Sequence, residues 1–204
     1  MQRMKFLLRH LLIISILSYC RCRSNDDRDK TDTSVKAIYV KKLLNETGPL
    51  IVFLGNEGRI NHPICWRSQK TVDVERGFRH ILTYFRKDNQ GRKKRGSWQV
   101  RNTTYRVSRR EGLPTIGVTA LMENGTRDED ISRVYDIFYA HPSCFVMGTP
   151  LNESDDSRCL LWAPRDIPRP TRINCEGAFF EACNNVGIFM YRYRKRVCET
   201  EEEE

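Results

Sequence analysis

Residues 135–198 read YDIFYAHPSCFVMGTPLNESDDSRCLLWAPRDIPRPTRINCEGAFFEACNNVGIFMYRYRKRVC, and this stretch decides the fold. It holds most of the cysteines that follow the N-terminal apolar run: Cys144, Cys159, Cys175, Cys183 and Cys198. The long middle of the chain holds only Cys65. Cysteines concentrated at one end of a secreted chain indicate disulfides that fasten that end to the rest of the fold.

One segment inside this stretch predicts a helix. In Arg172–Asn184, the residues Cys175, Phe179 and Cys183 are spaced four apart, so a helix would place them on one face, toward the rest of the fold. Three prolines precede it and are expected to stop the helix from starting earlier: Pro164, Pro168 and Pro170. Gly187–Val197, rich in aromatic residues, then predicts a last strand that ends beside Cys198.

The chain before this stretch predicts strands separated by turns. Apolar and polar residues alternate between Gly- and Asn-rich breaks. The predicted strands are a run beginning at Leu50, Ile64–Val74, Phe78–Lys87, Ser97–Ser108, Thr115–Met122, Ser132–Tyr139, Ser143–Met147 and Cys159–Trp162. About eight strands at this spacing are typical of an antiparallel barrel or sandwich.

The N-terminus predicts a secretory signal peptide over residues 1–22, followed by a single domain over residues 23–204. A basic start leads into the apolar run Phe6–Leu17, which is shorter than the roughly 20 residues that a membrane span needs. Asn25–Ser34 is polar and predicts a loose segment, and Val35–Leu44 predicts a short amphipathic helix. The acidic tail after Cys198 completes the domain.

Cysteine and sequon counts agree with secretion into an oxidising compartment. Removal of the leader takes away Cys20 and Cys22 and leaves six cysteines, an even number suited to three disulfides. Four N-glycosylation sequons point the same way: Asn45, Asn102, Asn124 and Asn152. We therefore expect an extracellular glycoprotein.

Charge and motifs favour a binding protein over an enzyme. The chain is basic, with a formal net charge of +9, and we interpret this as a solvated surface rather than a nucleic-acid site. No nucleophile elbow, zinc-protease motif or phosphate-binding loop occurs in the sequence. The histidines of the mature chain are not at metal-ligand spacing. We expect no catalysis, metal or cofactor.

The layout of residues 135–198 resembles the tick salivary lipocalins, the tick histamine-binding protein family. The features that carry the resemblance are Cys144-Phe-Val, the run Cys159-Leu-Leu-Trp162, two cysteines on a helix and a tyrosine-rich strand ending in Cys198. The resemblance implies an all-β, eight-stranded antiparallel lipocalin-like barrel with a C-terminal α-helix packed outside and a ligand cavity inside. It also implies three disulfides, Cys65–Cys198, Cys144–Cys175 and Cys159–Cys183.

The resemblance also identifies candidate ligand-binding positions. Amine-binding members carry an aspartate after the first of these cysteines and a glutamate two residues before the tryptophan. Here Phe145 and Leu160 stand at those places, although Trp162 is retained. A buried cationic amine needs a carboxylate partner. Asp136 supplies one only if its side chain faces inward, and we expect it to face the solvent.

An acidic ligand is the other expectation, since two carboxylates are replaced and aromatic residues are kept. Arg101 lies near Trp98 and Tyr105 on a predicted strand, and an arginine inside a cavity would hold a ligand carboxylate. A glycan on Asn102 would force that residue outward and turn Arg101 inward.

The sequence thus predicts a secreted, monomeric salivary carrier that sequesters a small host mediator. The mediator is a biogenic amine such as histamine or serotonin, or a lipid acid such as a leukotriene. The alternative is a module on the same barrel that binds a host protein or glycosaminoglycans. That alternative uses the basic segments 86–95 and 101–110.

Overall fold

The computed structural model describes residues 24–92, 95–149, 157–184 and 186–199. The predicted signal peptide and the predicted glycosylation site Asn152 lie outside the described residues, as does the end of the acidic tail. Among the described helices, none has the length and apolar character needed to cross a membrane.

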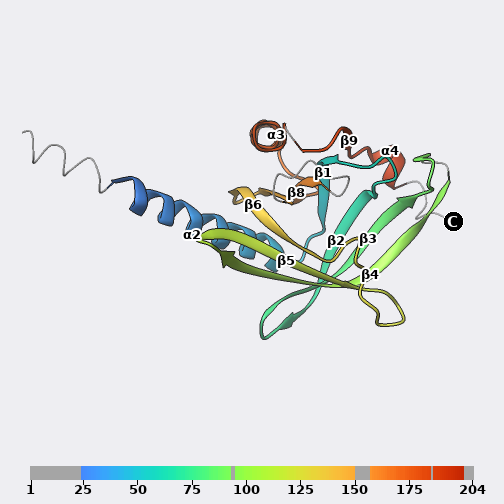
Figure 1. Ribbon diagram of the computed structural model, residues 1–204, viewed down its shortest axis with the longest axis horizontal. Coiled ribbons are helices and arrows are strands. Elements are labelled where there is room, and N and C mark those ends of the chain that lie inside the picture. The colour runs from blue at the N-terminus through green and yellow to red at the C-terminus, as the bar shows by residue number, and fades with distance from the viewer. Residues whose placement is uncertain (1–23, 93–94, 150–156, 185, 200–204) are drawn as a thin grey trace, which may run out of the picture.

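Eight antiparallel strands close into a barrel (Figure 1). They are β1 (Leu50–Glu57), β2 (Ile64–Val74), β3 (Gly77–Lys87), β4 (Gly96–Arg110), β5 (Leu113–Leu121), β6 (Arg133–His141), β7 (Cys144–Gly148) and β8 (Arg158–Pro164). Each strand pairs with the next along the chain, and β1 pairs with both β8 and β2. The pairing of β1 with β2 closes the barrel, and the predicted fold class is confirmed.

Alternation along the strands separates an inner from an outer face. On β8, Leu160 and Trp162 belong to the core inside the barrel, whereas Cys159 and Leu161 belong to a second core on its outside. The same alternation divides β7, where Phe145 faces inward. Both faces of β7 and β8 are therefore buried, as their near-continuous apolar sequences require.

Helix α3 covers the outside of the barrel over β7 and β8. It spans Arg169–Cys183 and buries Cys175, Phe179 and Cys183, the face that the four-residue spacing predicts. The helix begins earlier than predicted, with Pro168 as its N-cap and Pro170 in its first turn. Proline is tolerated there because the first-turn amides have no helical partner, so these prolines start the helix instead of delaying it.

Three disulfides fasten the C-terminal part of the chain to the barrel. They join Cys144 to Cys175, Cys159 to Cys183 and Cys65 to Cys198, the same pairs that the family resemblance implies. The first two tie α3 to β7 and β8. The third spans 133 residues and closes the longest loop. In the chain-entropy model a loop of that length contributes about 5 kcal/mol.

The predicted last strand is much shorter than expected. Strand β9 covers only Phe189–Arg192 and pairs with the end of β1, and the chain then forms one helical turn, α4 (Lys195–Cys198). Gly187 precedes β9 with φ +67°, and a Cβ there would lie 2.4 Å from the backbone of Glu57. Glycine thus allows the chain to cross β1 closely before β9 begins.

The N-terminal helix is longer than predicted. Helix α2 spans Ser24–Asn45, so the segment expected to be loose is helical. Its last turns enter one end of the barrel, where Val40, Leu43 and Leu44 are buried in the interior core. Ile38, an apolar residue of the segment predicted to be an amphipathic helix, is 60 % exposed. Packing of these last turns anchors a helix whose polar first half has no apolar face of its own.

Candidate functional site: the barrel interior

Aromatic side chains from four strands meet inside the barrel. The Trp66 ring stacks on Tyr84 with ring centroids 5.1 Å apart, and it meets Trp162 edge-on at 6.3 Å. Trp162 in turn stacks over Phe145 at 6.5 Å. All four side chains are almost fully buried. They provide the apolar walls and ring faces that a small-molecule site needs.

A buried ion pair lies against these rings. Glu57 and Arg158 are direct cross-strand partners on β1 and β8, and Arg158 Nε donates to Glu57 Oε2 at 2.8 Å. Each side chain is only 3 % exposed. The Arg158 guanidinium also lies 5.2 Å from the centre of the Trp66 ring and donates to the Tyr135 hydroxyl.

Burial and the partner's charge act in opposite directions on each member of this pair. Burial raises the pKa of the Glu57 carboxyl, and the adjacent Arg158 opposes this rise. Burial alone would lower the pKa of Arg158, but Glu57 more than compensates, so the pKa of Arg158 is raised. The guanidinium therefore stays protonated and neutralises the carboxylate beside it.

A second buried ion pair involves the connection between β5 and β6. Arg101 Nε donates to Asp128 Oδ2 at 2.6 Å, and the Tyr84 hydroxyl donates to the same oxygen at 3.1 Å. Both charged side chains are less than 10 % exposed. Burial and the nearby Asp128 raise the pKa of the Tyr84 hydroxyl, which remains a donor.

Two buried polar atoms have no hydrogen-bond partner among the described residues. They are Glu57 Oε1, an acceptor, and Trp162 Nε1, a donor. An unpaired buried polar atom costs about 1–3 kcal/mol, so such atoms need an explanation. Both lie on side chains of the barrel interior, so the interior offers one free acceptor and one free donor to a guest molecule.

A polar chain joins the strands to α2 at the end of the barrel that the helix enters. The Tyr105 hydroxyl is 3.0 Å from Ser68 Oγ, which is 3.0 Å from His80 Nδ1. His80 Nε2 is 2.9 Å from the carbonyl oxygen of Leu44, the penultimate residue of α2. A carbonyl only accepts, so Nε2 donates to it and Nδ1 accepts from Ser68. Burial lowers the pKa of His80 to about 4 and keeps the ring neutral.

The predicted ligand-binding residues divide between the two faces of the barrel. Those on its inner face are Trp162, Leu160, Phe145, Arg101 and Tyr105. Asp136 lies on the other face of β6 and pairs with Arg110 at 2.8 Å. Trp98, another candidate ligand residue, is 37 % exposed and packs on Phe85, on the other face of β4 from Arg101 and Tyr105. Trp98 and Arg101 are three positions apart, and residues an odd number of positions apart on a regular strand point to opposite faces.

The three described sequons are compatible with glycosylation. Asn45, Asn102 and Asn124 all have exposed side chains. Asn102 points outward while its neighbour Arg101 is buried, which is the arrangement expected for a glycan at that position. The role of these residues as glycan acceptors stays a prediction.

Sequence reasoning identified Arg101 but missed three other charged residues of the interior: Glu57, Asp128 and Arg158. Arg158 lies two positions before Leu160 on the same strand, so both side chains point to the same face. Strand alternation could therefore have predicted that Arg158 faces inward. Glu57 follows a β-bulge between Val52 and Leu54, which changes the facing of β1 and hides that signal. Asp128 lies outside the strands, where no periodicity marks it.

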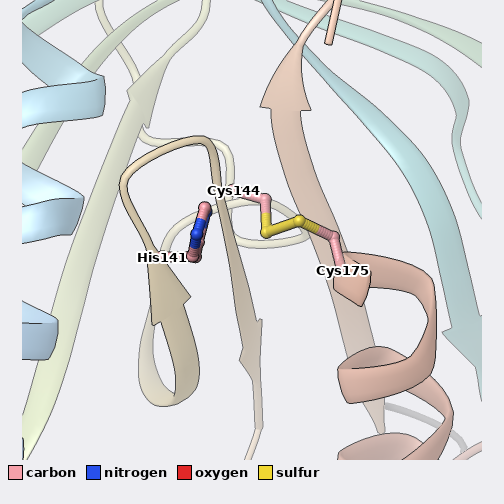
Figure 2. Close-up of side chains that lie close together, drawn as sticks. All are labelled: His141, Cys144 and Cys175. Carbon is pink, nitrogen blue, oxygen red and sulfur yellow. A yellow bond between two sulfur atoms is a disulfide. The ribbon is translucent and has the colours of Figure 1, made fainter. Parts of the chain in front are cut away.

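Within the described part of the chain, one cluster of side chains that can act as metal ligands lies outside the barrel interior. The side chains of His141, Cys144 and Cys175 lie together, with their ligand atoms within 4.8 Å of one another (Figure 2). The two cysteines form a disulfide with each other. A metal needs deprotonated thiols, so the intact disulfide leaves only the histidine as a ligand.

A hollow outside the barrel is a less suitable ligand site. It measures about 530 Å³ and lies between β1, α3 and the C-terminal segment. Several of the charged residues around it pair with one another, as in the contact of Arg165 with Glu199 at 2.7 Å and that of Arg192 with Glu176 at 3.2 Å. The barrel interior, with its aromatic walls and unpaired polar atoms, remains the better candidate.

Comparison with known families agrees with this architecture. The family model described as tick histamine binding protein matches residues 65–199, about two thirds of the chain. The chain belongs to this family. The matched region runs from Cys65 through Cys198 and so includes all three disulfides and both tryptophans of the interior. No curated protein sequence matches the chain.

Several solved structures are similar to the chain. One is Japanin from Rhipicephalus appendiculatus bound to cholesterol, at 15 % identity and a TM-score of 0.48, with 76 % of this chain and 97 % of that chain covered. Another is H1 crustacyanin from the lobster Homarus americanus, at 13 % identity and a TM-score of 0.43, with 76 % and 81 % covered.

Proposed function

We propose that the chain is a secreted salivary carrier that takes up a small host mediator inside its barrel and so reduces inflammation at a feeding site. Two things support this proposal: membership of the tick histamine-binding family and the chemistry of the interior. The observation that carries it is the pair of unpaired buried atoms, Glu57 Oε1 and Trp162 Nε1, among aromatic side chains. Carriage requires binding and no catalysis.

The charges of the interior favour a lipid mediator over a biogenic amine. A buried ammonium group needs a carboxylate whose charge is free to compensate it. Glu57 is neutralised by Arg158, and Asp128 is neutralised by Arg101. Phe145 and Leu160 occupy the positions where amine-binding relatives carry acids. The same pairing leaves Arg158 and Arg101 without a free charge for a buried carboxylate. A mostly apolar molecule whose buried polar groups are uncharged hydroxyls, such as a leukotriene with its carboxylate outside the interior, therefore fits better than histamine or serotonin.

Isothermal titration calorimetry against a four-member panel tests this proposal. The panel is leukotriene B4, arachidonic acid, histamine and serotonin, each titrated into the glycosylated, disulfide-bonded protein. We expect saturable one-to-one binding of at least one lipid and at least tenfold weaker binding of both amines. Trp162→Phe removes the free donor and should weaken lipid binding about five- to tenfold, equivalent to one hydrogen bond.

The matched control is Trp98→Phe, which makes the same change on the outer face and should leave the affinity unchanged. If none of the four compounds bound, the result would refute small-ligand carriage and favour the alternative, a barrel that binds a protein or a glycosaminoglycan. Tight binding of histamine without binding of either lipid would refute the ligand class only.

A further inference from the structure

The connection between β5 and β6, residues 122–132, covers the end of the barrel opposite to α2. Its Asp128 reaches Tyr84 and Arg101, near the end of β3 and the start of β4. Ile131 from the same connection is buried in the interior core. Helix α2 fills the other end with Val40, Leu43 and Leu44. A molecule that enters past either of these described segments would have to displace it.

Polar bonds hold the 122–132 connection in place. Asp128 Oδ2 accepts from Arg101 at 2.6 Å and from Tyr84 at 3.1 Å. Asp130 lies between two arginines, with Oδ1 3.3 Å from Arg59 and Oδ2 3.4 Å from Arg86. Its backbone carbonyl also accepts from Arg158, at 3.2 Å. Two aspartates thus attach the connection to β3, β4, β8 and the β1–β2 loop.

The two covers differ in the cost of displacing them. Lifting α2 would expose three fully buried apolar side chains to water, and this cost has no compensation. Lifting residues 122–132 would expose one buried apolar side chain, Ile131. The hydrogen bonds and ion pairs that break there would be replaced by hydration of the freed charges, so most of their energy is recovered. The 122–132 connection is the cover that opens more easily.

We propose that residues 122–132 form the gate of the barrel and that Asp128 and Asp130 are its two fastenings. The inference rests on the proposed function, since a gate matters only if a ligand enters. Opening breaks the Arg101–Asp128 pair and the contacts of Asp130, and withdraws Ile131 from the interior. Helix α2 stays in place during uptake and release.

Hydrogen–deuterium exchange tests which cover opens, without any ligand. The backbone amide of Asp128 donates to the Ala120 carbonyl of β5, so it exchanges only when the connection separates from the strand. We expect the amide of Asp128, resolved from the exposed residues 123–127 of the same connection, to exchange at least tenfold faster than the amides of residues 40–45. Faster exchange in 40–45 would overturn the proposal.

Stopped-flow uptake of a fluorescent fatty acid, 11-(dansylamino)undecanoic acid, tests the two fastenings. Asp128→Asn and Asp130→Asn should each raise the uptake rate, by about tenfold for Asp128→Asn and about threefold for Asp130→Asn. Asp136→Asn is the control, because Asp136 pairs with Arg110 on the outer face, away from the gate. Asp130 is 41 % exposed at its side chain, so its variant folds even if Asp128→Asn does not.

The outcomes separate the gate from the carrier function. If the wild-type protein binds neither this probe nor the calorimetric panel, the carrier function fails, and the exchange experiment alone decides whether the connection is the weaker cover. If the probe binds and both gate variants take it up at the rate of the wild type and of Asp136→Asn, the gate is refuted while the carrier function stands.

Discussion

His80 is a single residue on which the fit of α2 to the barrel depends. Its neutral ring links Ser68 to the Leu44 carbonyl, and burial lowers its pKa to about 4. His62 is also buried, and its pKa is lowered to about 4 by burial and by the nearby Lys87. In the unfolded chain both histidines return to a pKa of about 6.5. The two residues make the fold sensitive to mild acid.

The first prediction concerns pH. As the pH falls from 6.5 toward 4, the two histidines become protonated in the unfolded chain but stay neutral in the folded chain. The free energy of unfolding therefore decreases. Each histidine should account for about 2 kcal/mol at pH 5. Urea unfolding at pH 7.5 and pH 5 measures this difference. His80→Gln should remove about half of it, and a pH dependence unchanged in His80→Gln would contradict the assignment.

The second prediction concerns the Glu57–Arg158 pair. Glu57→Gln leaves a buried guanidinium without its carboxylate and should lower the free energy of unfolding by about 3–5 kcal/mol. The double variant Glu57→Leu with Arg158→Met removes both charges and should recover most of that loss. Both values are measured by urea unfolding at pH 7.5.

The control for the ion pair is Asp136→Asn. Asp136 pairs with Arg110, whose side chain is 49 % exposed, and loss of such a pair should change the stability by less than about 1 kcal/mol. If the double variant were as unstable as Glu57→Gln, the destabilisation would come from lost packing instead of an uncompensated charge.

At the scale of elements, α2 is the part of the fold whose role was least evident from its sequence. Its first half is polar, and the helical segment extends well beyond the apolar positions that marked it. What holds it is the burial of its last two turns in the barrel. Propensity and periodicity report on a helix in isolation, whereas this helix depends on a tertiary contact.

The third prediction separates the two sides of α2. Leu43→Ala should lower the free energy of unfolding by about 2–5 kcal/mol because it leaves a cavity in the interior core. Ile38→Ala, on the same helix and 60 % exposed, should change it by less than about 0.5 kcal/mol. Chemical denaturation measures both, and equal effects would contradict the packing of α2 described above.

The sequence patterns predicted the bounds and buried faces of some other elements correctly and those of others incorrectly. The bounds of β2, Ile64–Val74, agree with those predicted, because turn residues end it on both sides. The buried face of α3 also agrees, since a helix fixes the spacing of its own cysteines. The last strand was predicted too long, because its tyrosines alternate through Tyr193 while pairing with β1 ends at Arg192. Alternation gives the facing of residues but not the extent of pairing.

At the scale of the whole molecule, the site combines residues that lie far apart in the sequence. Glu57 and Arg158 are 101 residues apart, and Arg101 finds its partner in a connection between strands. Strand alternation predicted that Arg101 faces inward beside an outward Asn102. It could not predict that Asp128 neutralises it, because closure of the barrel and the path of the 122–132 connection decide that contact.

The central claim is that a lipid mediator binds inside the barrel, and the position of the tryptophans allows a direct test. Trp66 and Trp162 line the interior, whereas Trp98 lies on the outer face. The test is quenching of tryptophan fluorescence by leukotriene B4 in two variants, Trp98→Phe and the double variant Trp66→Phe with Trp162→Phe. We predict that Trp98→Phe retains the saturable quenching of the wild type and that the double variant loses it. Quenching lost in Trp98→Phe and kept in the double variant would place the ligand on the outer face and contradict the account.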